Sequence, residues 1–251
     1  MKKILMTVLI CSLSLIPLSA AGMTKGDFVK KAQEHFSDKL SFEDFSALCT
    51  GELQGDAQND TAYQSEIYAN LAYANIKRSN LVEAKADNKK ALSLNQKSAR
   101  AIFNQGVILN MEGHHLEAYT HMMESAAKAK KNPNIHDAFI KKAREYANSA
   151  AITAAALWKA FDDNEVAAEE MHKGKLVLVK GAISAITTDV SGYPVVSFNV
   201  DRTGLAKVNC VFPKESRSVI GILKKGQSVL IPGICEGMIL GQVFVKDCQV
   251  N

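Results

Sequence analysis

The chain has 251 residues, of which 30 are Lys or Arg and 26 are Asp or Glu, so its formal net charge is +4. Two of these lysines lie at the start of an apolar N-terminal segment, and the rest of the chain is nearly neutral at about +2. This balance excludes a protein whose overall charge alone would drive it onto polyanions.

The N-terminus predicts a secretory signal peptide over residues 1–21. Two lysines precede an apolar run over residues 4–18, and Ser19, Ala20 and Ala21 follow it. A charged start, a short apolar core and small residues at its end are the three parts of such a signal. We expect cleavage near Ala20 or Ala21, a periplasmic or secreted protein, and no transmembrane segment after cleavage. The alternative, an uncleaved membrane anchor, is disfavoured because the apolar core is short.

Residues 22–160 predict a helical domain that contains two copies of one helical pair. The segments 65–98 and 99–132 align without gaps, and small residues recur at equivalent positions: Ala72, Ala84 and Ala91, then Gly106, Ala118 and Ser125. This pattern resembles the tetratricopeptide repeat (TPR), in which small residues let paired helices approach closely. Because two repeats cannot bury their own faces, we expect capping helices over 25–49 and 135–160.

The TPR resemblance implies a partner-binding groove on the concave face of the repeats. Its members in this chain are Glu66, Tyr73, Ile76, Lys77, Arg100, Phe103, Val107, Asn110 and Met111. An apolar centre with charges around it is typical of a surface that binds a peptide or protein. We expect an unknown envelope protein or peptide as the partner. The alternative is that the N-terminal helices or the C-terminal domain pack into this groove.

Residues 161–251 predict a five-stranded barrel. Apolar residues alternate along five short segments: 176–183, 195–200, 207–212, 226–235 and 243–248. Alternation buries one face of each strand, and so few strands suit a small closed barrel of the OB type. The break at 213–225 has room for a short helix. The predicted fold class is therefore α+β in two domains, an α-helical TPR-like repeat stack followed by a five-stranded OB-type β-barrel.

Short motifs in the C-terminal part carry a second resemblance. They run in order from Asn164-Glu165-Val166-Ala167-Ala168, through Val179-Lys180-Gly181 and Val208-Asn209-Cys210-Val211-Phe212, to Pro232-Gly233-Ile234-Cys235-Glu236-Gly237 and Asp247-Cys248. This order resembles the "tRNA-anticodon-binding-like" OB family of exported bacterial proteins. The resemblance implies an OB fold; the family name records a likeness of fold and does not by itself imply an established tRNA activity. The family usually has Asp and Tyr where this chain has Glu169 and His172.

Four cysteines follow the predicted signal peptide: Cys49, Cys210, Cys235 and Cys248. Export permits disulfides, and four cysteines allow three full connectivities. In an OB barrel the third and fifth strands are parallel neighbours, so the resemblance favours a bond between Cys210 and Cys248. The alternative is that the cysteines are small buried apolar residues. No metal site is expected, because no C-x-x-C or H-x-x-x-H spacing occurs.

The predicted barrel carries the excess of positive charge, with nine Lys and Arg against five Asp and Glu over residues 175–251. A candidate face for an anionic ligand comprises Lys180, Arg202, Lys207 and Tyr193. The alternative is a solvated surface. Proteins that bind single strands also need aromatic platforms, and Tyr193 alone among the barrel aromatics is expected to be free to stack. The sequence therefore disfavours nucleic acid as a partner.

Motifs for catalysis are lacking in the sequence. It contains no glycine-rich phosphate loop, G-x-S-x-G or H-E-x-x-H, so we predict a non-enzymatic protein without a cofactor. The leading hypothesis is an exported adaptor that holds a protein in the TPR-like groove and carries an accessory OB-fold binding domain. The alternative is an OB-fold module that binds an oligosaccharide or single-stranded nucleic acid.

Overall fold

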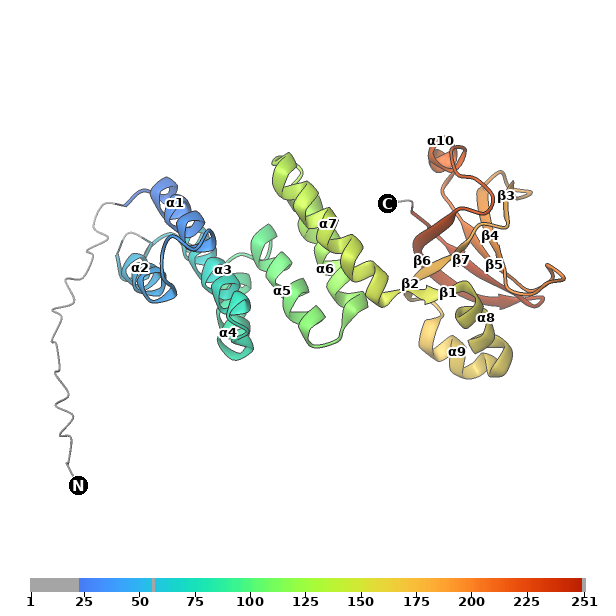
Figure 1. Ribbon diagram of the computed structural model, residues 1–251, viewed down its shortest axis with the longest axis horizontal. Coiled ribbons are helices and arrows are strands. Elements are labelled where there is room, and N and C mark those ends of the chain that lie inside the picture. Colours follow the sequence, from blue (N-terminus) through green and yellow to red (C-terminus); the bar gives the residue numbers. More distant parts are fainter. Residues whose placement is uncertain (1–22, 56, 250–251) are drawn as a thin grey trace, which may run out of the picture. The chain divides into compact units, whose positions relative to one another are not determined.

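The computed structural model describes residues 23–55 and 57–249, and the predicted signal peptide lies outside the described residues. The described chain is α+β, with ten α-helices and a seven-stranded mixed sheet (Figure 1). It divides into two compact units, the first ending at Asn104 and the second beginning at Gln105. Within the described ranges, no helix combines the length and the apolar character needed to cross a membrane.

The first unit is helical. Its elements are α1 (Lys25–Phe36), α2 (Phe42–Gln54), α3 (Thr61–Lys77), α4 (Leu81–Leu94) and the first part of α5 (Ala99–Met111). The first three helices each begin at a side chain that accepts a backbone N–H, namely Thr24, Ser41 and Asp60. Such N-caps satisfy donors that the first helical turn leaves unpaired. The capping segment predicted over 25–49 is thus two helices, and the second continues to Gln54.

An aromatic core holds α1, α2 and α3 together. Phe28 and Phe45 are fully buried, and their ring centroids are 6.2 Å apart. The ring of Tyr63 meets Phe28 edge-on at 5.7 Å. Edge-on and tilted pairs of this kind stabilise a core beyond the area they bury.

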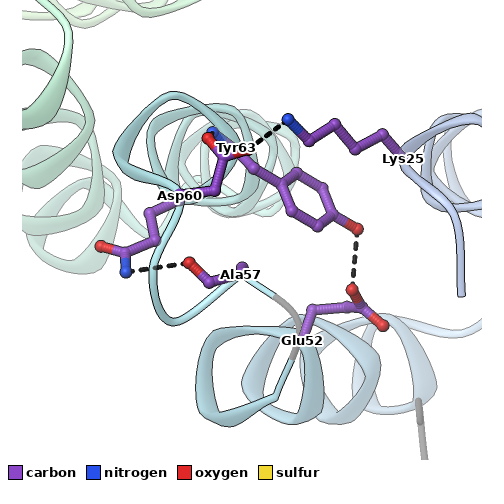
Figure 2. Close-up of polar contacts among 6 residues, drawn as sticks. Lys25, Glu52, Ala57, Asp60 and Tyr63 are labelled. Carbon is purple, nitrogen blue, oxygen red and sulfur yellow. Dashed lines mark hydrogen bonds and ion pairs between the residues drawn. The ribbon is translucent and has the colours of Figure 1, made fainter. Parts of the chain in front are cut away.

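Polar contacts join the same three helices (Figure 2). The Tyr63 hydroxyl donates a 2.8 Å hydrogen bond to Oε2 of Glu52, a side chain with no exposed surface. Lys25 of α1 forms an ion pair with Asp60, which is also the N-cap of α3. The hydrogen bond matters for stability because a buried carboxyl that lacks a donor is costly.

Small residues bring α3 and α4 close together. Ala72, Ala84 and Ala91 have no exposed surface. Ser65 Oγ of α3 donates a 2.9 Å hydrogen bond to the Ala91 carbonyl of α4. The small residues that define the first predicted repeat therefore lie where helices meet.

The second unit begins with the rest of α5, followed by α6 (His115–Lys128) and α7 (Pro133–Ala150). A Cβ at Gly106 would lie 2.8 Å from Met122 Cε and 3.0 Å from the Ala118 carbonyl oxygen, so α5 and α6 touch at this glycine. The N-cap of α6 is His114, which aligns with Asn80, the N-cap of α4. These positions agree with the sequence alignment, whereas membership of the TPR family stays a prediction.

The single helix predicted over 135–160 is wrong, because the chain breaks it after Ala150. The short strand β1 (Ile152–Thr153) follows, and α8 (Ala154–Asp163) then starts a new helix. Thr153 Oγ1 accepts a hydrogen bond from the Ala156 N–H at 3.1 Å and so caps α8. When a threonine hydroxyl caps a new helix in this way, the backbone has an alternative to continuing the preceding helix. A further helix, α9 (Glu165–His172), leads into the sheet.

The sheet contains β2 (Leu176–Ala182), β3 (Ala185–Thr188), β4 (Pro194–Asn199), β5 (Lys207–Val211), β6 (Ser228–Ile239) and β7 (Gln242–Lys246) in addition to β1. The strand order is β1-β2-β6-β7-β5-β4-β3. The prediction of five strands is corrected to seven, because β1 joins β2 and because β3 forms after a bend. The parallel pairing expected between the third and fifth predicted strands is confirmed for β5 and β7.

Only Ile183 and Ser184 separate β2 from β3. The Ile183 N–H donates to the Gln227 carbonyl, and the Ser184 N–H donates to the Ser197 carbonyl on the β4 side. Pairing therefore passes from β6 to β4 across this bend. Helices α8 and α9 lie at one end of the sheet, and α10 (Arg217–Ile220) lies at the other (Figure 1).

Candidate ligand-binding face

Alternation along β4, β5 and β7 separates core residues from a second row of side chains. The inward members are apolar and buried in one cluster: Val196, Phe198, Val208, Cys210, Val243 and Val245. Because successive side chains of a strand point to opposite faces, the residues between them point outward. We call this set the outer face: Val195, Ser197, Asn199, Lys207, Asn209, Val211, Gln242, Phe244 and Lys246.

A polar row crosses the middle of the outer face. Ser197 Oγ donates a 2.7 Å hydrogen bond to Asn209 Oδ1, and Asn209 Nδ2 donates a 2.7 Å hydrogen bond to Gln242 Oε1. Ser197 and Asn209 are each only 6% exposed although they point outward. The row fixes side-chain orientations across the three strands and leaves the half-buried ring of Phe244 beside it.

Tyr193 lies just before the first residue of β4, at one edge of the outer face. Asp189 Oδ1 accepts hydrogen bonds from the N–H groups of Ser191 and Tyr193 at 2.9 and 2.8 Å, which stabilises this turn. Gly192 has φ +86, a left-handed conformation that favours glycine. Tyr193 as a whole residue remains 40% exposed.

Two cations stand beside this turn. Lys214 Nζ lies 4.9 Å from the centroid of the Tyr193 ring, within the range of a cation–π contact. Arg217 Nη2 donates a 2.8 Å hydrogen bond to the Gly192 carbonyl. Both come from the segment after β5, which the fold brings next to the turn before β4. A positive edge around an exposed ring therefore forms from two distant parts of the sequence.

A pocket of about 480 Å³ opens at this edge; its walls are Tyr193, Val211, Phe212, Pro213, Lys214, Glu215, Lys246 and Asp247. Lys246 Nζ forms a 2.6 Å ion pair with Glu236 Oε1. The hydrogen bond that Lys246 donates to Glu236, together with the negative charge of Glu236, raises the pKa of Lys246, so this amine stays charged. The pocket thus combines an aromatic ring, apolar floor residues and two lysines, with two carboxylates that moderate its charge.

The structure divides the anionic-ligand face that the sequence predicts. Tyr193 precedes the start of β4, whereas Lys207 pairs with Asn199 at the other end of that strand. Lys180 is exposed on β2, away from the outer face, and Arg202 is exposed in the turn before β5. The residues that accompany Tyr193 are instead Lys214 and Arg217, and the sequence offers no local signal for this because the pairing of β4 with β5 creates it.

The predicted groove of the first unit is partly filled from within. The ring of Phe36, at the end of α1, packs edge-on against Tyr73 with centroids 5.0 Å apart, and Phe103 lies 6.2 Å from Tyr73. Lys77 Nζ reaches the Phe36 carbonyl at 3.5 Å. This contact supports the alternative that an N-terminal helix packs into the groove.

The other predicted groove residues have mixed surroundings. Glu66 is exposed, and Ile76 is buried. Arg100 is half-buried, and burial lowers the pKa of its guanidinium while the negative charge of Glu66 favours the charged form. In the second unit lie Val107, Asn110 and Met111; Asn110 Oδ1 contacts His115 Nδ1 at 2.9 Å, and Met111 is exposed.

All four cysteines of the described chain are buried free thiols, so the predicted disulfide between Cys210 and Cys248 is not formed in the structure. The nearby thiol of Cys248 and burial nonetheless raise the pKa of Cys210. Residues 23–55 and 57–249 hold no group of three or more His, Cys, Asp or Glu side chains arranged to bind a metal ion.

Comparisons with known proteins place this fold in a family. The tRNA_anti-like family model matches residues 1–249. A crystal structure described as a candidate nucleic acid-binding lipoprotein from Klebsiella pneumoniae is similar to 42% of this chain and 95% of its own chain, with 19% identity and a TM-score of 0.35. No curated protein matches the sequence. Because the family model extends over nearly the whole sequence, the chain belongs to the tRNA_anti-like family.

Proposed function

We propose that the protein is a non-enzymatic binding protein that holds single-stranded nucleic acid on the outer face of β4, β5 and β7. Such ligands are bound by aromatic platforms for the bases and by cations for the phosphates. One observation carries the proposal: the exposed ring of Tyr193, with Lys214 over it, borders a pocket that shares its face with Phe244. The family description is compatible with the same class of ligand.

The dimensions of the face suit a short stretch of polymer. Phe244 lies in the row of Asn209 and Ser197, because Asn209 pairs with both. Tyr193 lies four residues before Ser197, so at about 3.3 Å per residue the two aromatic rows are about 13 Å apart. A ligand that contacts both rings must therefore extend along the strands, as a single strand does and a mononucleotide does not.

The charges on the outer face predict a modest electrostatic contribution to the binding of nucleic acid. Lys207, Lys214 and Lys246 provide positive charge, but Glu215 and Asp247 line the same pocket. For a site that neutralises about two phosphates of a single strand, the logarithm of the binding constant falls with the logarithm of the salt concentration with a slope of about −1.4. Stacking must then supply much of the affinity, at about 1–3 kcal/mol per base.

The finer architecture that we propose follows the strand order. If β2 and β3 are one strand bent at Ile183 and Ser184, then five strands pair in the order of an OB-type barrel, and β1 is an addition at the edge. For the helices we propose a TPR-like pair of repeats. For residues 1–21 we propose a cleaved signal peptide, which N-terminal sequencing of the exported protein would test.

An adaptor role remains the second candidate function. It is favoured by the exposed charges of Glu66 and Lys77, which flank the aromatic residues Tyr73 and Phe103. It is opposed by Phe36, because this ring already occupies the surface of Tyr73 that a partner would use. A partner would therefore have to displace the end of α1.

The proposal is tested by fluorescence anisotropy with a labelled oligothymidine, over a salt series, on the wild type and three variants. Tyr193→Ala should weaken binding by about 5- to 100-fold through the loss of one stacked base. Lys246→Gln should reduce the magnitude of the salt slope by about 0.7, the contribution of one phosphate contact to a single strand.

The matched control is Lys180→Gln, which removes the same charge from an exposed lysine off the outer face. It should leave the affinity nearly unchanged. Equal losses in Lys246→Gln and Lys180→Gln would mean that binding follows net charge, which contradicts a defined site. A preference for an anionic oligosaccharide over the oligothymidine would reassign the ligand class.

A further inference from the structure

Three cysteines meet in the core of the second unit. Cys210 of β5 and Cys235 of β6 pair with Val245 of β7 from its two sides. Cys248 follows β7, and its N–H donates a 3.1 Å hydrogen bond to the Val211 carbonyl. Each of the three side chains is at most 1% exposed. Three thiols therefore lie together in the core of the second unit, and none of them belongs to the outer face.

The fold places the thiols of Cys210 and Cys248 against one another. The nearby thiol of Cys248, together with burial, raises the pKa of Cys210, and the Cys248 thiol itself donates a 3.4 Å hydrogen bond to the Val245 carbonyl. Gly233 of β6 leaves the space that Cys248 fills, because a Cβ at Gly233 would lie only 2.7 Å from Cys248 Sγ. The position of Cys248 therefore depends on a residue without a side chain on the neighbouring strand.

Strand geometry selects this pair over the other combinations. A disulfide needs Cα atoms about 4.4–6.8 Å apart. Cys210 and Cys235 lie on either side of β7, which puts them two strand spacings, or about 9.5 Å, apart. The Cys248 N–H donates to the carbonyl of Val211, the residue after Cys210, so Cys248 lies alongside the end of β5 with no strand between them. Cys49 belongs to the first unit.

We propose that Cys210 and Cys248 are a redox pair that closes to a disulfide when a thiol–disulfide oxidant is present. The thiolate of Cys248 attacks one sulfur of the oxidant's disulfide and releases the other sulfur as a thiolate. Cys210 then attacks the Cys248 sulfur, forms the Sγ–Sγ bond and releases the oxidant's second thiolate. The two protons lost by the cysteines pass to these thiolates, so two thiols are oxidised and one disulfide is reduced to a dithiol.

Access to these buried thiols comes from the segment after β7. Cys248 lies beyond the last paired residue of that strand, and Asp247 before it has φ +49, a left-handed conformation uncommon for a residue other than glycine. Local opening of such a segment costs less than global unfolding. Attack by Cys248 followed by Cys210 is therefore the order that the fold permits.

The bond would join two walls of the pocket on the outer face. Val211 and Phe212 follow Cys210 directly, and Lys246 and Asp247 directly precede Cys248. Oxidation would hold these walls at a fixed separation. This consequence rests on the proposed function, whereas formation of the bond does not.

The test uses the full chain carrying Cys11→Ser, incubated under native conditions with oxidised glutathione and then alkylated. Intact mass should show a product lighter by two hydrogen atoms, and peptide mapping should find Cys210 linked to Cys248. Cys235 and Cys49 should be alkylated after denaturation. Cys235→Ser is the matched control, because it removes a buried thiol that also flanks Val245, and it should still form the bond.

Two results would overturn the proposal. One is the recovery of all four thiols after oxidation, both in the native protein and in protein refolded in the same glutathione buffer. The other is a cross-link that involves Cys235 or Cys49. The test measures a covalent bond and needs no nucleic acid. Its outcome is therefore independent of whether the outer face binds nucleic acid.

Discussion

The first unit packs aromatic side chains against one another, whereas the second unit, which also buries Phe161, Phe198 and Phe212, keeps one ring at an exposed edge. In the first unit rings contact rings: Phe28 meets Phe45 and Tyr63, and Phe36 covers Tyr73. In the second unit the ring of Tyr193 is bordered by a cation and a pocket. An aromatic residue that packs on other rings stabilises the fold, whereas one held at an exposed edge by a turn is available to a ligand. The rings of the first group stabilise the fold, and Tyr193 is the ring that the proposed binding site would use.

The largest effect should follow from the aromatic core of the first unit. Phe45→Ala removes a fully buried ring and should lower the free energy of unfolding by about 3–5 kcal/mol. Hydrogen exchange measured by mass spectrometry should show the loss of protection in α1, α2 and α3. Tyr193→Ala serves as the comparison and should cost less than about 0.5 kcal/mol, since exposed positions contribute little to stability. Equal costs for the two variants would break the distinction.

A smaller effect is expected where α5 meets α6. Gly106→Leu must push Met122 and the Ala118 carbonyl away and should cost about 3 kcal/mol of stability. Chemical denaturation monitored by circular dichroism measures it. Gly113→Ala is the control for glycine replacement, because that position has open space around it, although its φ of +86 adds some strain. Wild-type stability of Gly106→Leu would show that the close helix approach, and with it the repeat assignment, is wrong.

The buried hydrogen bond of the first unit should contribute about 2 kcal/mol. Tyr63→Phe keeps the ring in place and removes the hydroxyl that donates to Glu52. The double variant Tyr63→Phe/Glu52→Leu should recover part of the loss, because it also removes the carboxyl left without this donor. Urea denaturation of the single and double variants forms the cycle. No coupling between the two sites would mean that the contact does not stabilise the core.

The smallest effect concerns alkaline pH. Burial, followed by the negative charges of Asp87 and Glu52, raises the pKa of Cys49 above its ordinary value of 9.0. The unfolded state then loses its proton first, so the stability contributed by the neutral thiol is fully present below pH 9 and decreases above it. Between pH 8.5 and pH 10 the reduced protein should lose about 1 kcal/mol from this group. In Cys49→Ala this part of the pH dependence should disappear; an unchanged slope would show that the burial of this thiol is not its cause.

The sequence predicts those features that arise from local pattern. Alternating apolar residues identify β4, β5, β6 and β7 within one or two residues of most of their observed ends, and small residues at equivalent positions indicate where helices touch. The break of the predicted helix at Thr153 is less evident, because alanines on both sides favour a helix while a capping hydroxyl competes with it.

The candidate site depends on pairing between distant segments and is mostly invisible in the sequence. Lys214 and Arg217 reach Tyr193 only because β4 pairs with β5, and Phe36 reaches Tyr73 only because α1 packs near α3. Neither contact can be recognised from a residue spacing or a motif in the sequence. The resemblance to the OB family implies that the strand of Cys210 and the strand before Cys248 are neighbours, and the parallel pairing of β5 with β7 agrees with this expectation.

Binding at the outer face is tested most directly by a hydrogen-exchange footprint of an oligothymidine on the full chain, read by mass spectrometry. We expect protection at the turn 189–193, the segment 207–217 and the strand Gln242–Lys246, with no change around Phe36, Tyr73 and Phe103. Protection centred on Tyr73 and Phe103 would contradict binding at this face. The absence of protection at low salt with excess oligothymidine would also contradict it.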